Sequence, residues 1–216
     1  MIFNIDPLND VLSRDDRPDL IHGVTVGLVT NNQDPDGLGR VKVKLPWLSN
    51  EDESAWARLA TPMAGNARGI YFVPEVDDEV LVAFEHGHIG SPYVLGALWN
   101  GKDKPPEAGD EKNTKRTIKS LSGHIIRLDD TDGEGKIEII DRTAKNSIVI
   151  STADNTITIS ADADIVIKAA SGKVTISGQN GVEISSQTAV KVDSQGSVDL
   201  QATGQMNVKG SIVNLN

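Results

Sequence analysis

The chain has 216 residues, 31 acidic and 21 basic side chains, a net charge of −10 and no cysteine. The absence of cysteine excludes disulfides, thiolate catalysis and Cys-ligated metal sites. The acidic balance disfavours nonspecific nucleic-acid binding, because residues 1–110 carry 18 acidic but only 9 basic side chains. The first residues show no basic stretch followed by an apolar one, and no run of 18 apolar residues is present. We therefore expect no secretory leader, synthesis in the cytoplasm and no membrane-spanning helix.

Residues 1–20 combine five aspartates with a few apolar side chains. We expect a short arm that docks on a neighbouring protein, with Ile2, Phe3 and Ile5 as anchors. A partly disordered terminus is the alternative.

Residues 21–100 predict a small barrel. Apolar and polar residues alternate in Val24–Leu28 and Val41–Leu45, and Val80–Phe84 is a short apolar run. Gly, Pro, Asn and Asp separate these stretches. All eight aromatic residues lie between Phe3 and Trp99. Five or six such strands with an aromatic core favour an OB-type barrel. We expect a linker and neck over residues 101–136, where prolines and charges are dense.

We expect a needle over residues 137–216. From about Ile148 to the end, pairs of aliphatic residues separated by one residue, usually a polar one, recur about every eight residues. Gly, Ser, Asn and Asp lie between the pairs, which is the composition of turns. Alternation places both members of a pair on one face of a strand. The expected core positions are Ile148, Ile150, Ile157, Ile159, Ile165, Ile167, Val174, Ile176, Val182, Ile184, Val190, Val192, Val198, Leu200, Met206 and Val208.

This repeat offers too little apolar surface for one copy to fold alone. Each strand supplies two sizeable apolar side chains, whereas ordering the backbone costs about 1–2 kcal/mol per residue. We therefore expect an all-β protein in which the barrel precedes a triple-stranded β-helix made by three intertwined copies, a homotrimer. A monomeric β-helix or a two-sheet sandwich is the alternative.

Five phrases stand out along the barrel: Gly39–Trp47, Ala57–Pro62, Arg68–Gly69, Val73–Phe84 and Val94–Gly101. In this order they resemble the phage baseplate assembly protein V and VgrG spike family. The segment Ser122–His124, the phrase Leu128–Thr131 and the repeat after them are also similar to that family.

The resemblance implies a non-enzymatic spike in a contractile phage tail or injection machine, in which a needle is driven through a target membrane. It implies assembly into a baseplate, with only transient contact with the membrane. Only about 20 residues precede the barrel, so a separate hub protein is expected. Some relatives end in a metal-binding His-x-His apex, but no His follows His124 here. We therefore expect a platform for a separate PAAR-type tip protein, formed by Ile212, Val213, Asn214, Leu215 and Asn216.

The candidate sites for other chemistry are weak. His86 and His88 are spaced to share a metal on a strand, but the neighbouring glycines favour a turn, and we expect no metal and no cofactor. The acidic run at Asp129–Glu134 lacks the spacing of an EF-hand. A carbohydrate-acting β-helix and an OB-type nucleic-acid binder with an oligomerisation tail stay open as alternatives, although the repeat lacks aromatic residues and the first half is acidic.

Overall fold

The computed structural model describes residues 20–49 and 51–214. Within these residues every regular element is a strand, apart from the three-residue 3-10 turn η2 (Glu85–Gly87). None of their helical segments has the length and apolarity needed to cross a membrane. The all-β prediction is confirmed for this part of the chain.

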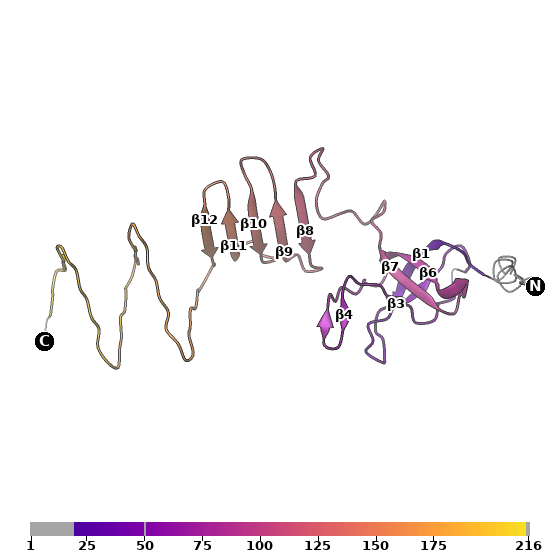
Figure 1. The fold of residues 1–216 in the computed structure, drawn as a ribbon, viewed down its shortest axis with the longest axis horizontal. Helices are drawn as coiled ribbons and strands as arrows, with labels where there is room; N and C mark the ends of the chain where they lie inside the picture. The colour runs from indigo at the N-terminus through magenta and orange to yellow at the C-terminus, as the bar shows by residue number, and fades with distance from the viewer. Residues whose placement is uncertain (1–19, 50, 215–216) are drawn as a thin grey trace, which may run out of the picture. The chain divides into compact units, whose positions relative to one another are not determined.

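The first sheet is a curled, five-stranded half-barrel in the order β2-β1-β6-β7-β3 (Figure 1). The β3–β7 pair is parallel and the other pairs are antiparallel. Register shifts leave Thr30 of β1 and Leu95 of β7 as extra residues, and such bulges increase strand twist. The strands are β1 (Val24–Asn31), β2 (Lys42–Lys44), β3 (Arg58–Leu59), β6 (Glu79–Phe84) and β7 (Pro92–Ala97).

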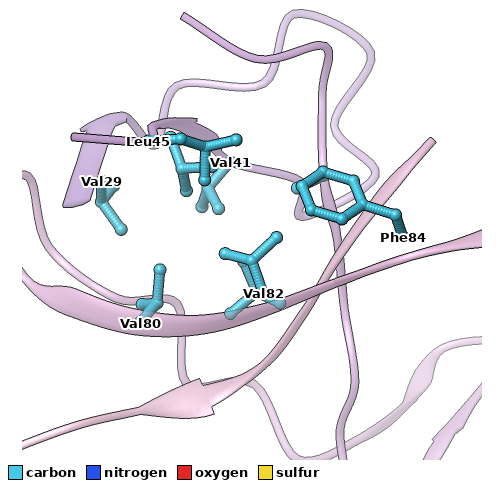
Figure 2. Close-up of a cluster of buried hydrophobic side chains, with 9 residues drawn as sticks. Val29, Val41, Leu45, Val80, Val82 and Phe84 are labelled. Atoms are coloured by element: carbon cyan, nitrogen blue, oxygen red, sulfur yellow. The ribbon is translucent and has the colours of Figure 1, made fainter. Parts of the chain in front are cut away.

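A bridge beside the two edge strands draws the sheet into its curl. Val41 and Ala57 exchange both backbone hydrogen bonds, at 3.0 and 2.7 Å, next to β2 and β3. The curl encloses a small aliphatic core, in which alternating residues of β6 face side chains from β1 and β2 (Figure 2). The core consists of Val29, Val41, Val43, Leu45, Ala57, Val80, Val82, Phe84 and Val94. This is the architecture expected of an OB-type barrel.

One stretch with a strand-like pattern leaves the barrel wall. Residues 69–73 have the composition of a strand, but only Arg68–Gly69 (β5) pairs, with Ala64–Gly65 (β4). The backbone N–H of Ile70 donates to the carbonyl of Met63, and the Thr61 hydroxyl donates to the carbonyl of Ile70. This short hairpin takes the backbone out of the sheet, so Tyr71 and Phe72 are exposed. Alternation alone does not reveal it, because the pattern of Ile70–Val73 also suits a buried strand.

A second antiparallel sheet, the neck sheet, runs in chain order from β8 to β12 (Figure 1). Short turns of Gly, Asp, Asn and Thr join neighbouring strands. Its first two strands lie in the segment assigned to the linker and neck, so regular pairing begins before residue 137. The strands are β8 (Lys115–Lys119), β9 (Ile125–Asp129), β10 (Lys136–Ile140), β11 (Ser147–Ser151) and β12 (Thr156–Ser160).

Residues 163–214, the repeat segment, form a separate unit with no strand assigned. Six-residue stretches alternate with bends at 179–180, 187–188, 195–196 and 203–204, an interval of eight residues. Figure 1 shows these stretches as the legs of a zigzag that do not pair with one another. The turn spacing expected from the sequence is therefore present, whereas pairing within this chain is not.

Candidate functional site: an apolar face without a partner

The neck sheet places isoleucines from all five strands in one row. Strand register aligns Ile118 with Ile126, Ile126 with Ile139, Ile139 with Ile148, and Ile148 with Ile159. A parallel row on the same face runs through Arg116, Leu128, Ile137, Ile150 and Ile157.

This face is uncovered in the single chain. The exposed fractions of its apolar side chains run from 38% for Ile150 to 70% for Ile157. Contiguous apolar surface of this kind marks an interaction site in a folded protein. Of the predicted core positions, the sheet brings Ile148, Ile150, Ile157 and Ile159 together.

The predicted core positions, which begin at Ile148, did not include the first half of the same face. Ile126/Leu128 and Ile137/Ile139 show the same spacing as the later pairs, one polar residue between two aliphatics. These two pairs are harder to recognise in the sequence, because a third aliphatic residue, Ile125 or Ile140, adjoins each pair and breaks the alternation.

The opposite face of the neck sheet is polar and partly covered by the linker. Arg127 donates to Glu107 at 2.6 Å and to Glu138 at 3.1 Å, and the Thr117 hydroxyl donates to Glu107 at 2.8 Å. These contacts lower the pKa of Glu107, first through Thr117 and then through Arg127. The pKa of Arg127 is raised, chiefly by Glu107. Because the polar side chains of this face pair with one another, the opposite, apolar face is the one left for a binding partner.

The repeat segment presents the same kind of surface. In each six-residue stretch the aliphatic pair occupies the second and fourth positions, as Val174 and Ile176 do in 173–178. Both are exposed, at 52% and 68%. The structure thus keeps the predicted pairs from Ile165 to Val208 in a constant register, but it does not bring them together by strand pairing within the chain.

Two predicted sites fall partly or wholly outside the described residues. Ile212 and Val213 of the expected tip platform are 80% and 48% exposed, whereas Leu215 and Asn216 lie outside. The predicted arm at 1–20 lies outside as well, except for Leu20.

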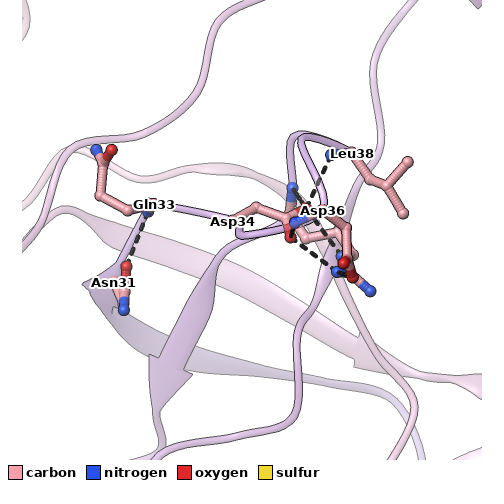
Figure 3. Close-up of polar contacts among 6 residues, drawn as sticks. Asn31, Gln33, Asp34, Asp36 and Leu38 are labelled. Carbon is pink, nitrogen blue, oxygen red and sulfur yellow. Dashed lines mark hydrogen bonds and ion pairs between the residues drawn. The ribbon is translucent and has the colours of Figure 1, made fainter.

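The loop between β1 and β2 is held by a single carboxylate (Figure 3). Asp34 accepts hydrogen bonds from the backbone N–H groups of Asp36, Leu38 and Arg40, and from the Arg40 guanidinium at 2.7 Å. The Arg40 hydrogen bond is the main cause that lowers the pKa of Asp34 well below its usual range. The Asp34 carboxylate therefore satisfies backbone N–H groups of the loop that have no partner in a strand ladder.

The described residues hold no group of three or more His, Cys, Asp or Glu side chains placed to bind a metal ion. His86 lies within η2 at a φ of 50°, and His88 follows the turn. The two histidines therefore lie in and directly after a turn, and not on one face of a strand. Asp129 accepts hydrogen bonds from the hydroxyl and the backbone N–H of Thr131, which lower its pKa. It therefore acts as a turn residue between β9 and β10.

Residues 25–99, which include the barrel strands, match the family model of the Type VI secretion system/phage-baseplate injector OB domain. Among curated proteins, 108 residues are 32% identical to the Type VI secretion system spike protein VgrG3 of Vibrio cholerae, covering 48% of this chain. The spike protein VgrG2a of Pseudomonas aeruginosa is also 32% identical over 108 residues, or 46% of this chain. VgrG1a of the same species is 28% identical over 130 residues, or 55% of this chain.

The matched part spans only 10%, 13% and 20% of the length of these three relatives. The similarity is therefore distant and concerns a small part of each spike protein. It confirms the resemblance seen in the barrel phrases: residues 25–99 match a baseplate-injector OB domain, and the likeness to VgrG spike proteins is distant.

Proposed function

We propose that this chain is the structural central spike of a contractile tail or injection-system baseplate. In this proposal the barrel joins a separate hub protein, and residues 137–216 form a membrane-piercing needle as a homotrimer. A PAAR-type tip protein sits on the C-terminal end. The assembled particle acts outside its place of synthesis and meets the target membrane only during puncture.

The observation that carries the proposal is the uncovered apolar face of the neck sheet, together with the unpaired legs of the repeat segment. A β-strand that pairs with nothing leaves its backbone N–H and C=O groups to water and offers no ladder to resist force. Among residues 163–214, the only backbone hydrogen bond outside regular elements joins Gly181 to Gly178. Strands of other copies are the natural partners, because they carry the same spacing.

Three copies fit this pattern. With one leg from each of two further copies inserted between consecutive legs, neighbouring strands are about 4.8 Å apart and a chain advances about 14 Å per leg. The aliphatic pairs of all three copies then face one shared axis, and the rows of the neck sheet continue that core. No catalytic role is needed for this function, which is mechanical: force is shared by many hydrogen bonds in parallel.

The solution mass of the purified chain tests the proposal. We expect light scattering to give three times the 23.1 kDa of one chain. A mass of one or two chains would contradict the homotrimer and, with it, the needle.

A further inference from the structure

The barrel carries a groove of about 1240 Å³ between its β3–β7 side and the β4–β5 hairpin. Its walls include Trp56, Tyr71, Phe72 and Tyr93, of which Tyr71 and Phe72 are 80% and 69% exposed. Exposed aromatic side chains with a polar edge are typical of the centre of a protein interface. The groove lies wholly within the barrel.

Cationic side chains line the same groove. Arg58 lies over the Tyr93 ring at 5.6 Å, and Arg40 over the Trp56 ring at 5.8 Å. Arg40 is paired with Asp34 and Asp36. Neither Arg58 nor Arg68, both lining residues, has a carboxylate partner within the part of the chain that the structure describes. Among the described residues that line the groove, Glu85 is the one with a carboxylate. The groove therefore suits a partner that brings an acidic and partly apolar segment.

The turn Glu75–Glu79 of the same barrel has this chemistry. Val76 is 48% exposed at its centre, and Asp77 beside it is exposed. The turn is rigid because the Asp78 carboxylate accepts the N–H of Glu75 at 2.8 Å, and the N–H of Asp77 donates to the carbonyl of Val29 at 2.9 Å. It thus presents an aliphatic side chain flanked by carboxylates in a fixed conformation.

Strand register places Arg58 of the groove and Glu79 of the turn toward opposite ends of the sheet. Arg58 aligns with Tyr93, which aligns with Ala83 and so with Val24 at the start of β1. Glu79 aligns with Leu28, four residues further along β1, a separation of about 13 Å. A surface whose complement lies elsewhere on the same molecule makes a head-to-tail contact, which closes into a ring when the rotation permits.

We propose that the acidic turn Glu75–Glu79 of one copy docks in the aromatic and cationic groove of the next, so that three barrels close into a ring around the spike. This inference rests on the proposed homotrimer and adds the contact that orients its barrels. Asp77 meets Arg58 or Arg68, and Val76 contacts the exposed aromatic side chains. Such charge complementarity fixes the register of an interface.

Disulfide crosslinking tests the contact cleanly, since the chain has no cysteine of its own. In the full chain, Met63→Cys on the hairpin combined with Val76→Cys on the turn should give covalent dimers and trimers under mild oxidation. Each single variant is the matched control and should stay uncrosslinked, because the proposed head-to-tail contact pairs two different positions of neighbouring copies. Crosslinking of a single variant would overturn the proposed geometry.

Charge reversal tests the ionic contact between Arg58 of the groove and Asp77 of the turn. On the double-cysteine background, Arg58→Glu should abolish the covalent trimer, and Arg58→Glu with Asp77→Arg should restore it. Lys102→Glu, in the linker, should leave crosslinking unchanged. A chain that has the mass of three copies but does not crosslink overturns the ring and leaves the spike proposal intact. A monomeric mass, by contrast, overturns the spike proposal itself.

Discussion

Single carboxylates fix several connections of this chain. Asp34 holds the β1–β2 loop, Asp141 holds the β10–β11 turn, and Glu107 ties the linker to the neck sheet. In each case one side chain accepts several hydrogen bonds, which favours its ionised form and lowers its pKa. At the residue scale, these connections should therefore weaken in acid.

Asp141 gives a defined pH window. Its hydrogen bonds, first of all that from Thr143, lower its pKa to about 2 from an ordinary value of 3.8. A folded pKa below the unfolded one stabilises the protein above the unfolded value, and the gain is lost as pH falls through the folded value. Asp141→Asn should accordingly flatten the fall in melting temperature between about pH 4 and pH 2. An unchanged pH profile would contradict this role.

Arg127 is the central cation of the polar face, between Glu107 and the buried Glu138. Arg127→Met should lower the free energy of unfolding by about 1.5–3 kcal/mol, because two carboxylates lose a charged donor. Lys145→Met is the matched control, since the Lys145–Asp162 pair is about 60% exposed on both sides and should cost less than about 1 kcal/mol. Denaturant unfolding measures both, and equal effects would refute the distinction.

At the element scale, the strands of the neck sheet and the legs of the repeat segment share one design: a polar face, and an aliphatic face without a partner in its own chain. The neck sheet satisfies its backbone by its own antiparallel pairing. The legs do not pair among themselves in residues 163–214, so in the proposed trimer their backbone partners would be supplied by other copies.

Ile176→Asp tests whether the aliphatic pairs form the core of a trimer. It would place three carboxylates together on a dry axis, at a cost of several kcal/mol per ion, and we expect the trimer to be lost in light scattering. Thr175→Asp is the matched control, because it adds the same charge one residue away on the opposite face. An intact trimer with Ile176→Asp would refute the assigned core.

At the scale of the whole molecule, folding and assembly should be one process. Unfolding of a trimer releases three chains, so a tenfold rise in concentration should stabilise it by about 2.8 kcal/mol per trimer. The melting temperature of the full chain, followed by circular dichroism under reversible conditions, should rise with protein concentration. A constant melting temperature would indicate a monomeric fold.

Much of this architecture was accessible from local pattern. The barrel strands were predicted from the alternation in Val24–Leu28 and Val41–Leu45 and from the apolar run Val80–Phe84, because every second residue of a strand faces the core. The eight-residue spacing of turns after residue 162 was also predicted correctly, since Gly, Ser and Asn favour turns through their own backbone preferences.

What the sequence by itself determined was thus the β class, the barrel strands, the resemblance to spike proteins and the spacing of the aliphatic pairs, all of which depend on neighbours along the chain. Only the tertiary structure decided which pairs share a face. It extended the aliphatic face back to Ile118, exposed Tyr71 and Phe72, and joined Glu107 to Arg127. These features depend on strand register and on contacts between distant residues, which local alternation does not encode.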